Sequence, residues 1–120
     1  MSIIRRNYQR IPLNIPVTII ITDYTLQEAV CKNISMGGMC ISVEDSSVEK
    51  QENGKVELNY HCEEEIIQFK GEFTIKWLYV GENNHREFGM QFTYYDASNS
   101  TNLARIVLNQ LNSEKSCTQA

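Results

Sequence analysis

From residue 12 to residue 95 the chain consists of short runs in which apolar residues alternate with polar ones or β-branched residues follow one another. Both patterns are typical of strands. Polar stretches rich in Asn, Asp, Ser and Gly separate the runs, as expected of turns and loops. Six strands are therefore predicted, at residues 17–22, 27–34, 38–43, 55–60, 66–80 and 88–95.

The segments between these runs predict particular connections. Residues 23–26 are predicted to form a turn, and residues 44–54 a charged loop that closes with an Asn-Gly pair. Gly71 interrupts the longest run and predicts a bulge or bend at that point. Short strands joined by such turns are typical of a mostly β protein, built as a sandwich or a barrel.

The pattern changes after residue 95. Apolar residues now recur three and four positions apart, which is the spacing of one helix face. A single amphipathic helix is predicted over residues 96–112, packed on the β core or over one mouth of a barrel. Its apolar positions are Leu103, Ile106, Val107 and Leu111, and the candidate N-caps are Asp96, Ser98 and Ser100.

The length of 120 residues suits one domain with one core. We divide that domain into an N-terminal arm (1–11), a β-barrel or sandwich (12–95), a helix (96–112) and a frayed tail (113–120). No apolar run approaches the roughly 18 residues that cross a bilayer, and the N-terminus lacks the apolar core of a signal peptide. A cytoplasmic protein with reduced cysteines is therefore expected.

Three arginines stand within six positions near the N-terminus, in the stretch RRNYQR, although the net charge of the chain is −4. Arg6 and Arg10 form an R-x-x-x-R pair whose guanidinium groups can converge on one ligand. A guanidinium can bond O6 and N7 of guanine together, stack on a base, or bind phosphate. The plainer interpretation is that these charges keep a terminus soluble. The acidic net charge argues against a general nucleic-acid binder, including a small RNA-binding barrel.

A second motif, N-x-S-x-x-G, follows at Asn33, Ser35 and Gly38, with Gly37 beside it. The Asn amide and the Ser hydroxyl both donate and accept hydrogen bonds. The two glycines permit positive φ and let a ligand approach the backbone closely. The plainer interpretation is an ordinary Gly-Gly turn between two strands with polar neighbours.

Together, in this order and spacing, the two motifs resemble the signature of the PilZ family, R-x-x-x-R followed by [D/N]-x-S-x-x-G. The stretch FGMQF at residues 88–92 resembles the G-x-x-F strand of that family, and the predicted helix follows where the family has one. The resemblance covers about residues 3–112. It implies a six-stranded antiparallel β-barrel with a C-terminal α-helix that binds the second messenger cyclic di-GMP, with no cofactor.

The resemblance also implies roles for individual residues. Arg6 and Arg10 would contact guanine faces and phosphates, with Arg5 as an additional contact. Asn33 and Ser35 would bond a guanine edge or a phosphate. The two adjacent glycines would allow close approach. The ligand-binding residues expected are Arg5, Arg6, Arg10, Asn33, Ser35, Gly37 and Gly38.

These roles lead to the hypothesis that the protein is a switch controlled by its ligand. Ligand would clamp the arm against the turn at 33–38, and a partner protein controlling motility, biofilm or virulence would bind the altered surface. The alternative is a PilZ-like module that binds proteins without nucleotide. An enzyme is not expected, because Ser35 lacks a G-x-S-x-G context and the two histidines have no correctly spaced metal partners. Trp77 and the aromatics of 88–95 are predicted to lie in the core or barrel wall.

Overall fold

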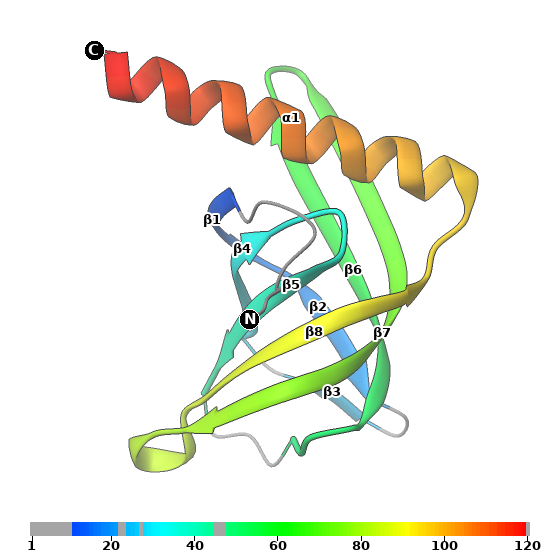
Figure 1. Ribbon diagram of the computed structural model, residues 1–120, viewed down its shortest axis with the longest axis vertical. Helices are drawn as coiled ribbons and strands as arrows, with labels where there is room; N and C mark the ends of the chain where they lie inside the picture. Colours follow the sequence, from blue (N-terminus) through cyan, green and yellow to red (C-terminus); the bar gives the residue numbers. More distant parts are fainter. Residues whose placement is uncertain (1–10, 22–23, 27, 45–47, 120) are drawn as a thin grey trace, which may run out of the picture.

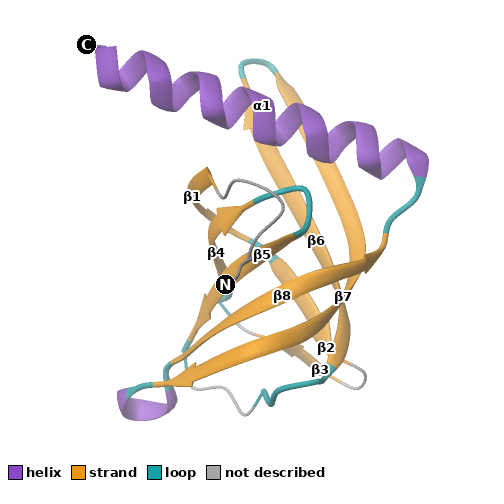
Figure 2. Cartoon of the chain, in the orientation of Figure 1, coloured by secondary structure: helices purple, strands orange, loops and turns teal. Residues whose placement is uncertain are grey.

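The computed structural model describes residues 11–21, 24–26, 28–44 and 48–119 of the chain. They form a curled sheet with α1 lying across one end (Figure 1), and strands dominate (Figure 2). In chain order the elements are β1 (Ile11–Pro16), β2 (Thr18–Ile21), β3 (Tyr24–Leu26), β4 (Val30–Ile34), β5 (Gly38–Val43), β6 (Asn53–Cys62), β7 (Glu65–Val80), the 3-10 segment η1 (Glu82–Asn84), β8 (Arg86–Tyr94) and α1 (Ala97–Gln119).

One continuous stretch of chain joins the two ends of the sheet. The strand order is β1-β4-β5-β8-β7-β6-β2-β3, and all neighbours are antiparallel. β1 pairs with β4 at one end, whereas β2 pairs with both β3 and β6 near the other end. Only Val17 separates β1 from β2. The sheet therefore curls round on itself, which confirms the mostly β, antiparallel fold with one C-terminal helix.

The described strands number eight, so the prediction of six was wrong in number. The extra strands arise because two extended runs are each broken in two. Residues 11–21 form β1 and β2, and residues 24–34 form β3 and β4. These two runs make one long hairpin, interrupted where the Val17 amide donates to the Ala29 carbonyl oxygen at 3.0 Å. The predicted turn at 23–26 was also wrong, because Tyr24–Leu26 is paired as β3.

The predicted apolar face of the helix closes the core. Leu103 and Ile106 are fully buried against the barrel, and Val107 and Leu111 are partly buried. Each fully buried side chain of this size stabilises the docked helix by about 1.5–3 kcal/mol. The helix begins at Ala97 and continues to Gln119, so it extends beyond its predicted end at residue 112.

α1 also covers an open strand edge. β7 pairs with β6 from residue 65 to 74 and with β8 from residue 72 to 80, so one edge of its first seven residues faces no strand in the described chain. Asn99 Oδ1 accepts a hydrogen bond from the Lys70 amide at 2.8 Å, and Asn102 Nδ2 donates to the Gln68 carbonyl oxygen at 2.8 Å. Side-chain amides on the helix thus replace part of a neighbouring strand.

The start of α1 is fixed by Asp96, one of the three predicted N-caps. Its Oδ1 atom accepts hydrogen bonds from the backbone and side-chain amides of Asn99, both at 2.9 Å. These bonds favour the ionised carboxylate, first the backbone bond and then the side-chain bond, and they lower the pKa of Asp96 from its ordinary value of 3.8. Asn99 therefore links the helix cap to the edge of β7.

Replacing Asn102 by alanine should destabilise the fold because the Gln68 carbonyl loses its partner. Relative to Thr101→Ala, we expect a free energy of unfolding lower by about 1 kcal/mol, with an unchanged denaturant m-value. Thr101 is the matched control, because it is exposed on the same helix and bonds only back to the Ala97 carbonyl. Equal midpoints for the two variants in urea unfolding would contradict this assignment.

The lowered pKa of Asp96 also predicts how stability depends on pH. Because the folded pKa lies below the unfolded value of 3.8, the carboxylate stabilises the fold above that pH. This contribution is lost as the pH falls through the folded pKa. Thermal melts of the native chain and of Asp96→Asn, which keeps a capping oxygen, should therefore converge as the solution is acidified from about pH 5 to about pH 2. A constant difference in Tm over that range would rule out this role.

Candidate functional site

The second motif forms the turn between β4 and β5. The Ser35 hydroxyl oxygen accepts hydrogen bonds from the amides of Gly37 and Gly38 at 3.1 and 3.2 Å, and the Ser35 amide donates to the Gly38 carbonyl at 2.9 Å. Ser35 is only 5% exposed. In this structure the hydroxyl therefore holds the turn together, and its predicted contact with a ligand stays a prediction.

Gly38 has a structural role in the fold, and its predicted role in ligand approach stays a prediction. None of the described glycines has positive φ, so the turn does not use the left-handed backbone that glycine permits. A Cβ atom at Gly38 would instead collide with the backbone carbonyl oxygen of Met90 in β8. Glycine is required here because the backbones of β5 and β8 approach each other closely.

A row of residues crosses the outer face of the sheet beside this turn. Pairing places Pro12 opposite Asn33, Asn33 opposite Cys40, Cys40 opposite Gly89, and Gly89 opposite Trp77. We call these five residues the outer row. With about 4.8 Å between strands, the row spans about 19 Å. It is uncharged, and Asn33 supplies a half-buried side-chain amide.

Trp77 lies on the outer face because of a one-residue bulge. Ile75 pairs with Met90 and Trp77 with Gly89, so Lys76 is an extra residue in β7. The bulge reverses which side chains point inward: Ile75 is fully buried, whereas Trp77 is 41% exposed. The indole lies over Gly89, since a Cβ atom there would overlap it. The prediction that Trp77 belongs to the core or barrel wall missed this exposed aromatic surface.

The predicted arginines Arg5, Arg6 and Arg10 lie outside the described residues. The described chain begins at Ile11, which pairs with Ile34 at the edge of the turn. The arm is thus attached directly beside the second motif. Arg6 precedes Ile11 by five positions, and five extended residues span up to about 18 Å, close to the length of the outer row. Covalent connection therefore allows both motifs to reach one surface.

Two further contacts hold the turn against the end of β8. The Phe92 amide donates to the Gly37 carbonyl oxygen at 2.9 Å, and the Tyr95 hydroxyl donates to the Met36 carbonyl oxygen at 3.0 Å. A hollow of about 480 Å³ lies beside these contacts, between the turn and residues 91–95. Tyr95 also packs edge-on against Phe69 and Phe92, so the turn is anchored through the aromatic core.

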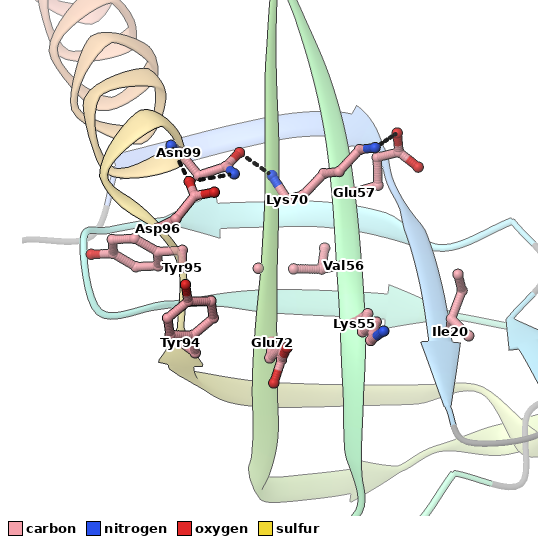
Figure 3. Close-up of a pocket in the computed structure, with 11 residues that line it drawn as sticks. Ile20, Lys55, Val56, Glu57, Lys70, Glu72, Tyr94, Tyr95, Asp96 and Asn99 are labelled. Carbon is pink, nitrogen blue, oxygen red and sulfur yellow. Dashed lines mark hydrogen bonds and ion pairs between the residues drawn. The ribbon is translucent and has the colours of Figure 1, made fainter.

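A different hollow, of about 330 Å³, lies on the outer surface of β6 and β7 and reaches the start of α1 (Figure 3). Its charges are mixed: Lys70 Nζ lies 3.7 Å from Glu57 Oε2, and Lys55 pairs in register with Glu72. Gly71, the predicted bend, is one of the residues that line it. Neither motif contributes a residue to it, so this hollow is not the candidate ligand site.

The described residues do not form a cluster of three His, Cys, Asp or Glu side chains able to hold a metal ion. Burial raises the pKa of Cys31 to about 12, which keeps that thiol protonated and unreactive at neutral pH. In the part of the chain that the structure describes, no helix combines the length and apolar character that crossing a membrane requires.

Comparison with known proteins matches this chain to the family model described as the PilZ domain, over residues 4–109. A search of curated protein sequences gives no significant match. Among solved structures, the inhibitor of motility MotI/DgrA of Bacillus subtilis has a TM-score of 0.75 at 22% identity, with 92% of this chain and 53% of that chain covered.

Two further similar structures are complexes with cyclic di-GMP. The PilZ domain of YcgR from Escherichia coli, with c-di-GMP, has a TM-score of 0.72 at 15% identity and covers 96% of this chain and 98% of its own. The MrkH–c-di-GMP complex of K. pneumonia has a TM-score of 0.70 at 14% identity, with 94% and 55% covered. This chain spans about half the length of the MotI and MrkH chains. At these identities the similarity establishes the fold.

The collision between Gly38 and Met90 yields a prediction about the fold beneath the site. Gly38→Ala should lower the free energy of unfolding by about 1–3 kcal/mol or more, because the β5–β8 backbones must separate. Gly81→Ala is the matched control, since a Cβ atom there meets its nearest neighbour at an ordinary 3.4 Å. Chemical denaturation of both variants tests this, and a Gly38→Ala protein as stable as Gly81→Ala would contradict it.

Proposed function

Because the chain belongs to the PilZ domain family, we propose that it is a receptor for cyclic di-GMP. The ligand would lie on the outer row, between the turn at 33–38 and the N-terminal arm. Arg6 and Arg10 would contact guanine and phosphate from the arm, with Arg5 as a further contact, and Asn33 would bond a guanine edge.

The observation that carries this proposal is the shape of the surface beside the turn. Between Asn33 and Gly89 the outer row carries only the small side chain of Cys40, and the indole of Trp77 occupies the space over Gly89, so a planar base would approach this surface beside the indole. The exposed indole of Trp77 borders the same area and offers a stacking face, which is worth about 1–3 kcal/mol per base. The outer row thus combines small residues, an exposed indole and an amide.

The charge of the outer row and of the arm is also compatible with cyclic di-GMP. The outer row has no ionisable Lys, Arg, Asp or Glu, so it does not repel two phosphates, and the arginines of the arm would provide the positive charge. A bidentate Arg–guanine contact is worth about 1–3 kcal/mol of discrimination. Several such contacts must exceed an association cost of about 4–15 kcal/mol. A low-micromolar Kd, about −8 kcal/mol, is therefore expected.

The fold neighbours support this assignment, because two similar structures contain c-di-GMP and another is an inhibitor of motility. We extend this to a cytoplasmic effector whose arm becomes ordered when ligand binds. The change at the start of β1 would alter a surface bound by a downstream protein acting in motility, biofilm formation or virulence. If nucleotide does not bind, the protein-interaction module without ligand is the remaining candidate.

Binding measured on the full chain tests the proposal. Arg6→Ala and Arg10→Ala should each weaken cyclic di-GMP binding at least about tenfold, the loss of roughly 1.4 kcal/mol of contact energy. Calorimetry gives the affinity, and fluorescence gives an independent signal because Trp77 is the single tryptophan. The control is Lys50→Ala, which removes an exposed cation from a different loop. Unchanged affinity in both arginine variants, or no heat with a folded native chain, would overturn the assignment.

A further inference from the structure

α1 satisfies the open edges of two strands with side-chain amides. On β7 the amides belong to Asn99 and Asn102. On β1, Gln110 Nε2 donates to the Pro12 carbonyl oxygen at 3.1 Å. A third edge, on the second half of β6, receives no such cover from the described residues.

This third edge arises where β1 and β6 diverge. β6 extends from Asn53 to Cys62, but its pairing with β2 covers only Gly54–Glu57. Beyond that point β1 turns away to pair with β4 alone. A cleft of about 540 Å³ separates β1 from β6, and we call it the β1–β6 groove. Residues 58–62 of β6 therefore pair with β7 on one side and face this groove on the other.

The groove has the lining expected of a site that binds one extended strand. Buried Leu13 and Tyr60 contribute an apolar lining, and exposed Asn59 and His61 belong to the β6 wall. Gln110 closes one end from α1, where the Tyr60 hydroxyl also bonds Asn109 Oδ1 at 2.7 Å. An unpaired edge of this kind is a template for another strand.

β6 is the better template of the two walls. β1 contains Pro12 and Pro16, which lack N–H groups, and a register shift lies between Pro12 and Ile15. Both features make a strand edge less able to pair with another strand. The β6 wall has a regular register with β7 from Asn53 to Cys62 and contains no proline. An added strand would therefore follow β6, with β1 as the opposite wall.

We propose that the β1–β6 groove binds an extended peptide segment of a partner protein, added as a strand antiparallel to β6. In that direction the N-terminal end of the segment lies beside the β6–β7 turn, where Glu63 and Glu64 are exposed. The lining has no Lys or Arg, and its one carboxylate, Glu57, lies at the opposite end, where Lys70 Nζ is already 3.7 Å from it. A segment with basic residues just before about five residues of alternating polar and apolar character fits this charge and lining.

The inference goes beyond nucleotide binding and does not require it, because the groove is present in the described chain without ligand. The probe is the capped peptide Lys-Arg-Thr-Val-Thr-Val-Thr, titrated into the full chain. The control peptide, Thr-Val-Thr-Val-Thr-Lys-Arg, has the same composition with its basic residues at the opposite end. NMR shifts and amide hydrogen exchange locate the contact.

We expect the first peptide to shift the NMR signals of the amides of residues 58–62 and to protect these amides from hydrogen exchange. It should bind at least about fivefold more tightly than the control peptide, because its basic residues lie near Glu63 and Glu64. A fivefold difference in affinity is about 1 kcal/mol. Glu64→Lys should remove that preference. Glu82→Lys makes the same charge change in η1, away from the lining of the groove, and should leave the preference intact. Equal affinity for the two peptides, or no perturbation at 58–62, would overturn the inference.

A titration of the same samples with cyclic di-GMP separates this inference from the proposed function. Peptide binding at 58–62 without nucleotide binding would reject the receptor assignment and support the groove. Nucleotide binding without any effect of the peptide at 58–62 would reject the groove and leave the receptor assignment intact.

Discussion

The backbone pairing of residues 11–21 determines how the rest of the molecule is arranged. This stretch bends at Val17, so its first half pairs with β4 and its second half with β3 and β6. Because one stretch contacts both ends of the sheet, the sheet must curl. The same bend places Ile11 beside the turn of the second motif and leaves β1 separated from β6. The candidate ligand surface and the β1–β6 groove therefore lie on opposite edges of one strand.

Much of this fold could be predicted from residue patterns. The alternation in 38–43 and 55–60 predicts β5 and the centre of β6, and the spacing of Leu103 and Ile106 predicts which helix face is buried. The breaks in the first two runs could not be predicted in this way. They depend on which neighbour each half finds across the barrel, and local sequence does not specify a distant partner.

The turn beside the proposed site was predictable, but the surface around that turn was not. The motif containing Asn33 and Gly38 correctly indicated a tight turn, and the register then shows which residues share its outer face. The exposure of Trp77 could not be predicted, because one inserted residue, Lys76, reverses the alternation of β7. A period-two pattern assigns faces only while the register is unbroken. The reason for glycine at position 38 was equally hidden, since the obstacle is the Met90 backbone on another strand.

The asparagine contacts on β7 have a consequence for the behaviour of the protein at high concentration. Without α1, the hairpin of β6 and β7 would expose a seven-residue edge that could pair with the same edge of another molecule. Asn99 and Asn102 bond that edge without extending the sheet. The C-terminal helix thus acts as a barrier to intermolecular sheet growth, and cleavage that released it would favour aggregation even if the barrel itself remained folded.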